Sequence, residues 1–389
     1  MNYRLVCRFL GIVAMLISLT MLFSLPWAYP SWGVRLAIEL PESGFESAGF
    51  SALCGSILIS AALGLILIAF GGRTSGHLYQ KEAMAVVGLA WIMATVLGGL
   101  PFYLSGTYRG PSVRLSEEGD VYVHRSNLFT SSHWQPKLDL PDHQRLAIGR
   151  LVEAGAVGLD NAQLSEDERN ALKLAASDRD IEKILVLPEQ GADGNARLRW
   201  VQMSFVDALF ESQSGFSTTG ATVISDLENP DLVPHCILFW RSSTHFLGGL
   251  GIIVLFVVIL GHGTAGKALM RNEVPGPSQE SSEARMQHTA QVFAAIYVGL
   301  TALLAGLLWL CGLSWFDALC HSFGTMATGG FSTYNASLGH FDSSLIDTVV
   351  IVFMVLAGTN FTLLYFLLRG QGSMLAGDYE WRAYIGIIL

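Results

Sequence analysis

Two stretches of sixteen residues decide the fold: FVDALFESQSGFSTTG at positions 205–220 and WFDALCHSFGTMATGG at positions 315–330. They align without a gap at a constant spacing of 110 residues, and the spacing persists to Gly248 and Gly358 in the apolar runs that follow. The identical pairs are Asp207 and Asp317, Ala208 and Ala318, Leu209 and Leu319, Ser212 and Ser322, Thr218 and Thr328, and Gly220 and Gly330. Internal repeats of this kind commonly frame a transport site in membrane proteins.

The surrounding sequence is that of a membrane protein. Hydrophobic residues make up 51% of the chain and charged residues 14%, whereas soluble domains carry about a quarter charged residues. Apolar runs of about 20 residues recur, and each is long enough to cross a hydrocarbon layer of about 30 Å as a helix. The predicted spans are Leu5–Trp27, Ser51–Gly71, Ala83–Leu104, Pro234–Leu260, Ala290–Leu310 and Leu345–Leu368, with a seventh apolar run at 383–389. The sequence therefore predicts an all-α polytopic membrane protein.

Each repeat has the order of a membrane helix, a pore loop and a second membrane helix. Residues 204–214 and 314–325 show helical spacing of apolar residues, and Asp207 and Asp317 lie near their starts, where a helix dipole favours a carboxylate. Both segments are too short to span a bilayer. We therefore expect two re-entrant half-helices, each followed by a small-residue loop.

The first loop, GFSTTGATV at 215–223, combines glycine with hydroxyl side chains and carries no charge. Glycine permits positive φ, so carbonyl oxygens can turn toward one axis and replace the hydration shell of an alkali cation. Close helix packing is the alternative meaning of small residues. We prefer that alternative for Gly248, Gly249 and Gly251 of the next span, whereas the second copy of the loop favours a cation filter.

Arginine and lysine gather in the connections at 72–82, 261–289 and 369–382, which the positive-inside rule places in the cytoplasm together with the N-terminus. The entering spans end at Leu104 and Leu310, which are 206 residues apart, so the first unit holds about 96 additional residues near 107–200. This polar insertion is expected outside the cytoplasm. It predicts a hairpin at 113–125 around Gly119 and a helix at 164–187 that starts with a Ser165–Glu168 capping box.

The pore stretches, the helix LVPHCILFWRSSTHFLGGLGIIVLFVVIL at 232–260 and EVPGP at 273–277 resemble the TrkH subunits of the Trk/Ktr/HKT potassium transporters. The resemblance implies four such units around one K⁺ path, each with one filter strand and a key glycine. It implies K⁺ as the transported ion, no organic cofactor, a homodimer and a cytoplasmic nucleotide-binding regulator of the TrkA type. Carried over by position, the filter residues are Ser217, Thr218, Thr219 and Gly220, then Ala327, Thr328, Gly329 and Gly330. The repeat spacing selects Gly330, rather than Gly329, as the second key glycine.

The predicted organisation follows the repeats. Two membrane helices occupy 1–81, the first pore unit 82–106 and 201–262, the insertion 107–200, a cytoplasmic loop 263–287, the second pore unit 288–369, and the start of a third unit 370–389. Two filter strands cannot enclose an ion. We expect either that the sequence is truncated at its C-terminal end or that two copies pair to complete the filter.

Within a predicted span, Arg241 is costly, and we interpret it as paired structurally or with a carbonyl group. The net charge of −9 argues against nucleic acid as a partner, and no pair of nucleophile and base supports an enzyme. The predicted function is K⁺ uptake across the bacterial inner membrane, in contact with membrane lipid. The alternative is a non-conducting sensor or assembly protein that uses 107–200 as a ligand-binding module, and a solvated spacer is also compatible with that segment.

Overall fold

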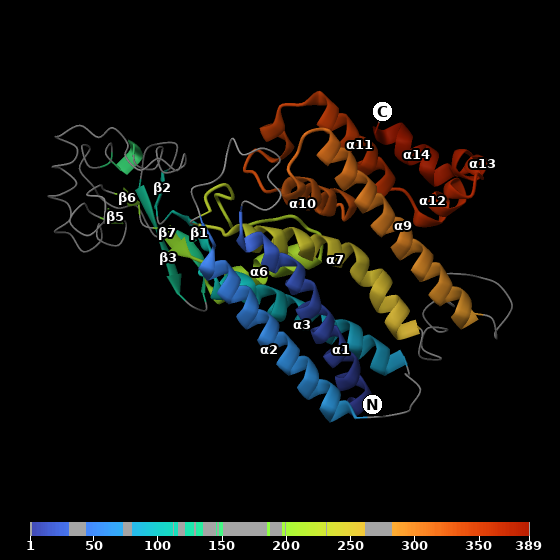
Figure 1. Cartoon of the computed structure of the whole chain (residues 1–389), viewed down its shortest axis with the longest axis horizontal. Coiled ribbons are helices and arrows are strands. Elements are labelled where there is room, and N and C mark those ends of the chain that lie inside the picture. The colour runs from blue at the N-terminus through green and yellow to red at the C-terminus, as the bar shows by residue number, and fades with distance from the viewer. Residues whose placement is uncertain are drawn as a thin grey trace. The chain divides into compact units, whose positions relative to one another are not determined.

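The computed structural model describes residues 2–30, 44–72, 80–111, 113–115, 121–127, 130–134, 145, 148–150, 185–186, 197–198, 200–230, 232–260 and 282–388 (Figure 1). The chain packs as two compact units. The helical unit comprises Met1–Ser105, Glu211–Ala221 and Pro234–Leu389. The strand unit comprises Gly106–Phe210 and Thr222–Val233.

Three helices open the helical unit and contact one another in pairs: α1 (Tyr3–Met21), α2 (Ser47–Gly71) and α3 (Gln80–Leu104) (Figure 1). A 3-10 turn, η1 (Leu22–Ala28), extends α1. Small residues let α1 and α2 approach closely, because a Cβ on Gly11 would lie 2.7 Å from the carbonyl oxygen of Gly64.

The second half of the helical unit is built from α7 (His235–Leu260), α9 (Ser282–Leu310), the short α10 (Trp315–Met326) and α11 (Ser344–Ala357). Helix α10 contacts α7, α9 and α11. Within the described ranges, four helices are long and apolar enough to span a membrane: Tyr3–Ala28, Ser47–Gly71, Met84–Leu104 and Gln291–Leu310. They confirm four of the predicted spans, and the protein is an all-α polytopic membrane protein with repeated pore-loop units.

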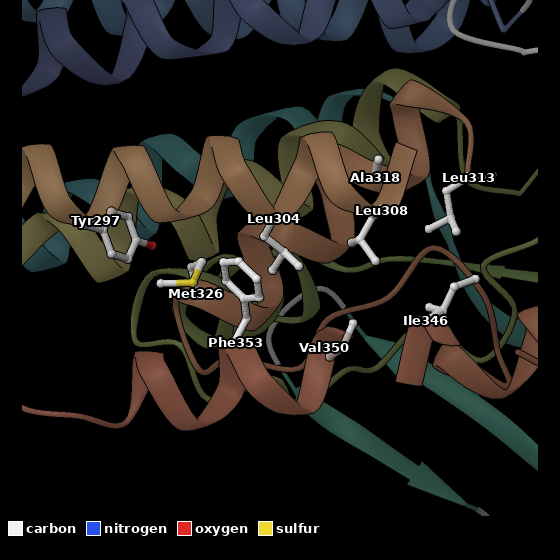
Figure 2. Close-up of a cluster of buried hydrophobic side chains, with 9 residues drawn as sticks. All are labelled: Tyr297, Leu304, Leu308, Leu313, Ala318, Met326, Ile346, Val350 and Phe353. Carbon is white, nitrogen blue, oxygen red and sulfur yellow. The ribbon is translucent and has the colours of Figure 1, made fainter. Parts of the chain in front are cut away.

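Figure 2 shows the core that holds α10 in place. Apolar side chains of α9 and α11 converge on Ala318 and Met326 of α10. The remaining members are Tyr297, Leu304, Leu308, Leu313, Ile346, Val350 and Phe353. Lipid tails are as apolar as these side chains, so close packing rather than expulsion of water holds helices together here. The short half-helix is thus fixed by packing on several sides.

The predicted span at 345–368 is broken in the structure. The segment forms α11 and α12 (Phe361–Leu368), which are bent by 107° at a short break. Asn360 caps α12 by accepting a hydrogen bond from the Thr362 amide at 2.9 Å. The space beside Gly358 is taken by the hydroxyl group of Tyr384, from α14 (Tyr379–Ile388). The polar side chain of Asn360 thus starts a new helix within an apolar segment whose hydropathy shows no break. Between these helices lies α13 (Gly372–Gly377), and η3 (Ser337–Phe341) precedes α11.

In the strand unit, β1 (Tyr108–Pro111) pairs antiparallel with β7 (Trp200–Gln202), with Tyr108 opposite Gln202. The two ends of the insertion therefore lie side by side. Strands β2 (Val113–Leu115) and β3 (Val121–Asn127) form the predicted hairpin, with Val113 opposite Val123, and β4 (Thr130–Trp134) extends it.

The helix predicted at 164–187 is wrong at its end. There Leu185–Val186 forms β5, which pairs with β6 (Arg197–Leu198). The apolar run ILVLP, closed by Pro188, favours a strand over the last turn of a helix. The rest of that predicted helix lies outside the described residues, as does EVPGP at 273–277.

Candidate functional site

Two half-helices of equal length carry the candidate filter loops. They are α6 (Phe205–Phe216) and α10, and both of their ends are related by the 110-residue spacing. Each begins in the same way: the amide of Asp207 donates to the Ser204 hydroxyl at 3.2 Å, and the amide of Asp317 donates to the Ser314 hydroxyl at 3.0 Å. The motif Ser-x-x-Asp thus caps both helices. The predicted half-helices are confirmed.

The loops that follow share an unusual backbone. Thr218 and Thr328 have φ of 52° and 54°, and Gly220 and Gly330 have φ of 77° and 88°. Left-handed φ costs a threonine about 1–2 kcal/mol, and such strain persists where the surrounding structure enforces it. The second positive-φ glycine is Gly330, as the repeat spacing predicts.

Backbone hydrogen bonds repeat as well. In the first loop, the Thr218 amide donates to the Gly215 carbonyl at 3.0 Å, and the Thr219 amide donates to the Ser214 carbonyl at 2.9 Å. The second loop has the same bonds at the same lengths, from Thr328 to Thr325 and from Gly329 to Gly324. The two loops are therefore conformational copies, although the aligned residues 213–220 and 323–330 differ at six of eight positions.

The two loops meet at their glycines. A Cβ added to Gly220 would collide with the carbonyl oxygen of Gly329. Of the eight predicted residues, Ser217, Thr219, Thr328 and Gly330 are exposed, Thr218 and Gly220 are half-buried, and Ala327 and Gly329 are buried. The half-helices direct their C-terminal, partially negative ends into these loops, which favours a cation there.

Helix α7 supports the first loop by direct contact with backbone. A Cβ on Gly248 would collide with the carbonyl oxygen of Phe216, at the end of α6. The hydroxyl of Thr244 fills the space beside Gly215. Within the loop, the Ser214 hydroxyl donates to the Ala221 carbonyl at 2.6 Å. The loop is thus held by contacts that larger side chains would displace.

Asp317 supports the second loop. Its carboxylate accepts hydrogen bonds from the Thr333 hydroxyl at 2.8 Å and from the Tyr334 hydroxyl at 3.3 Å. In the strand unit, the matching Asp207 instead pairs with Arg109 of β1 at 2.9 Å. The repeated carboxylate therefore has different partners: the segment after the loop in the second repeat, and the base of the insertion in the first.

A buried ion pair lies beside the loops. Arg241 of α7 donates from Nε to Glu211 of α6 at 2.6 Å, and from Nη1 to the Ser332 carbonyl at 3.0 Å. The prediction that Arg241 is paired structurally and with a carbonyl is confirmed. Glu211 was not predicted as its partner, because the second repeat has His321 at that position. A carboxylate inside a predicted half-helix was the signal that could have found it.

Comparisons with known proteins agree with this architecture. A family model described as "TrkH: Cation transport protein" matches residues 161–375, more than half of the chain. The chain is 44% identical over 188 residues to the Trk system potassium uptake protein TrkH of Escherichia coli K12, covering 48% of this chain and 38% of that protein. It is 46% identical over 163 residues to the Halomonas elongata TrkH, covering 41% and 33%. It is 38% identical over 192 residues to the E. coli TrkG, covering 49% and 39%.

The fold has a solved counterpart. The crystal structure of the potassium transporter TrkH from Vibrio parahaemolyticus matches with a TM-score of 0.60 at 24% identity, covering 100% of this chain and 57% of that one. The chain thus spans less than two fifths of the length of these curated relatives. Two capped half-helices ending in matched left-handed loops, together with the match over residues 161–375, show that the chain belongs to the TrkH family of cation transport proteins.

Proposed function

We propose that this chain contributes to K⁺ uptake across the bacterial inner membrane through a filter lined by backbone carbonyls. The observation that carries the proposal is the matched left-handed backbone of two loops that meet at Gly220 and Gly329. Oxygen atoms of carbonyl and hydroxyl groups are neutral ligands that can replace the water around K⁺. The relatives from E. coli and H. elongata are named potassium uptake proteins, which supports K⁺ as the ion.

In this proposal, Ser217–Gly220 form the first filter strand and Ala327–Gly330 the second. The first pore unit comprises 82–106 and 201–262, and the second comprises 288–369. The family resemblance implies four strands around the ion, so these two supply half of the filter.

The proposed orientation places the N-terminus and the loop at 263–287 in the cytoplasm, and the segment 107–200 outside. A cytoplasmic nucleotide-binding regulator of the TrkA type is the proposed partner, because the relatives belong to a multi-component Trk system by name. Lipid surrounds the apolar helices, and a homodimer is the proposed assembly.

Substitution at Gly220 tests the filter. In bacterial cells that lack their own K⁺ uptake systems, the full protein as its native gene encodes it should support uptake of Rb⁺ in preference to Na⁺. Gly220→Ser should lower the ratio of Rb⁺ to Na⁺ uptake, because a side chain adds about 1–2 kcal/mol of backbone strain and displaces the Gly329 carbonyl.

The matched control is Gly306→Ala in α9, where an added Cβ would meet no atom of the described residues within 4 Å. This control should leave the ratio unchanged. An unaltered ratio in Gly220→Ser, with normal amounts of protein in the membrane, would count against the filter.

The rival function, a non-conducting sensor, has one observation in its favour. Within the strand unit, Arg109 of β1 contacts residues that precede and follow the first pore loop in the sequence. Its side chain pairs with Asp207, which precedes the loop, and its carbonyl oxygen accepts from the amide of Ser225, which follows the loop, at 2.8 Å. A ligand bound by the insertion could therefore act through β1 on the segments that precede and follow this loop in the sequence. Ligand binding by a chain that supports no ion uptake would favour the rival.

A further inference from the structure

Ser332, two residues after Gly330, is held by residues of both repeats. Its carbonyl oxygen accepts from Nη1 of Arg241 at 3.0 Å. Its hydroxyl lies 3.0 Å from Nε2 of His321 and accepts from the Tyr334 amide, also at 3.0 Å. The side chain is buried. A contact from the first repeat therefore fixes the backbone just beyond the second candidate filter strand.

The guanidinium group of Arg241 also packs on Phe331, with its Cζ atom 3.5 Å from the ring centroid. The imidazole ring of His245 stacks on the same phenyl ring, with centroids 4.0 Å apart. Arg241 thus contacts both residues that follow Gly330: the ring of Phe331 and the carbonyl oxygen of Ser332. Displacing the guanidinium would free both contacts together.

Glu211 makes the buried arginine compatible with a cation path. The side chains of Arg241 and Glu211 are 2% and 0% exposed. An unpaired charge at such a position would be strongly unfavourable, and a lone positive charge would repel K⁺. The paired carboxylate cancels the charge while leaving the guanidinium fork free to donate to the Ser332 carbonyl.

The ion pair of Glu211 and Arg241 is present in the first repeat and has no counterpart in the second. The helix caps and the backbone hydrogen bonds of the loops, in contrast, are the same in both repeats. At the 110-residue spacing, His321 takes the place of Glu211, and Ile351 takes the place of Arg241. Ile351 is 56% exposed, so it occupies a different environment from the buried arginine. Packing that served each half-helix alone would be expected in both copies. Arg241 of this pair instead contacts Ser332, just beyond the filter strand of the second repeat.

We infer that Glu211 and Arg241 are positioning residues that hold Phe331 and Ser332, set the second filter strand (Ala327–Gly330) that precedes them, and thereby set the discrimination between K⁺ and Na⁺. This inference rests on the proposed function. The cation itself touches neither side chain. The pair acts through the Ser332 carbonyl and the Phe331 ring, whose positions determine where the carbonyls of the preceding glycines point.

Two variants in the full protein separate positioning from folding. Arg241→Lys retains the charge beside Glu211 but replaces the planar fork with a single ammonium group, which cannot reproduce both the pair and the carbonyl contact in the same geometry. The double variant Glu211→Leu, Arg241→Met replaces the ion pair with apolar side chains, an exchange that proteins often tolerate without loss of stability. The double variant also removes the donor to Ser332. Ile351→Met, at the matched position of the second repeat, is the control.

The measurements are the half-saturating concentration and the maximal rate of Rb⁺ and of Na⁺ uptake, with the amount of protein in the membrane as a check on folding. In both variants we expect normal amounts of protein and a fall in the Rb⁺-to-Na⁺ ratio of about tenfold or more, the effect of losing one hydrogen bond to a charged group. The control should keep the ratio of the unmodified protein.

Three outcomes would overturn the inference, and they are distinguishable. An unchanged ratio in well-folded variants would show that the pair does not position the filter. Failure of both variants to accumulate would show that the pair serves the stability of the whole chain. Absence of Rb⁺ uptake by the unmodified protein would remove the proposed function itself.

Discussion

At the scale of single residues, three glycines of α7 show how the surroundings decide what a small residue does. Close packing is the predicted role of Gly248, Gly249 and Gly251. A Cβ on Gly248 would collide with the Phe216 carbonyl oxygen, and one on Gly249 would lie 2.5 Å from the Tyr297 hydroxyl. Among the described residues, none has an atom within 4 Å of a Cβ on Gly251. The assignment is therefore confirmed for Gly248 and Gly249, whereas the described residues show no such contact for Gly251.

These neighbours give a matched pair of alanine substitutions. Gly251→Ala should stabilise the protein by about 0.5–1 kcal/mol, since alanine is the better helix former and no atom is displaced. Gly248→Ala should destabilise it, because α7 must move away from the end of α6. Thermal unfolding of the detergent-solubilised protein would compare them. Equal shifts in both variants would show that α7 does not rest on Phe216.

At the scale of elements, the repeat predicts well what local sequence controls. The half-helices follow from Ser204 and Ser314 as caps, and the loop bonds follow from residues within five positions of one another. The break in the predicted last span was missed, because Gly358 and Asn360 interrupt the helix without lowering its hydropathy enough to show. Tyr384, which occupies the space beside Gly358, lies far along the sequence.

The pairing of β1 with β7 predicts that the insertion can be removed. Because Pro111 lies opposite Trp200, a Gly-Ser turn of two to four residues in place of 112–199 would close the two strands as a hairpin. The Arg109–Asp207 pair would remain. We expect the shortened protein to retain Rb⁺ uptake, measured as isotope flux in cells without other K⁺ uptake systems.

The control is the same shortened protein with the additional substitution Arg109→Ala, which removes the ion pair between Arg109 and Asp207 of α6. A deletion variant that reaches the membrane but loses uptake would instead assign the insertion an essential role. That result would strengthen the sensor alternative.

At the scale of the whole molecule, the distribution of basic residues predicts orientation. Arg73 and Lys81 flank one connection, and Lys267 and Arg271 lie in another. Such loops remain in the cytoplasm. A reporter enzyme that is active only outside the cytoplasm should therefore be active when fused after residue 112 and inactive when fused after residue 270. The opposite pattern would invert the proposed topology and place the filter entrance on the cytoplasmic side.

The sequence by itself determined the membrane class, four of the spans, both half-helices and the glycine at which the second loop turns. Each of these depends on hydropathy or on residues close together in the chain, and the repeat supplied an internal check. Only the tertiary structure decided that the loops meet at Gly220 and Gly329, that Glu211 neutralises Arg241, and that Arg241 holds Ser332. Those contacts join residues 30 to 109 positions apart. The reason is physical: a buried charge needs a partner, but no local pattern states which distant group the packing of helices will bring to it.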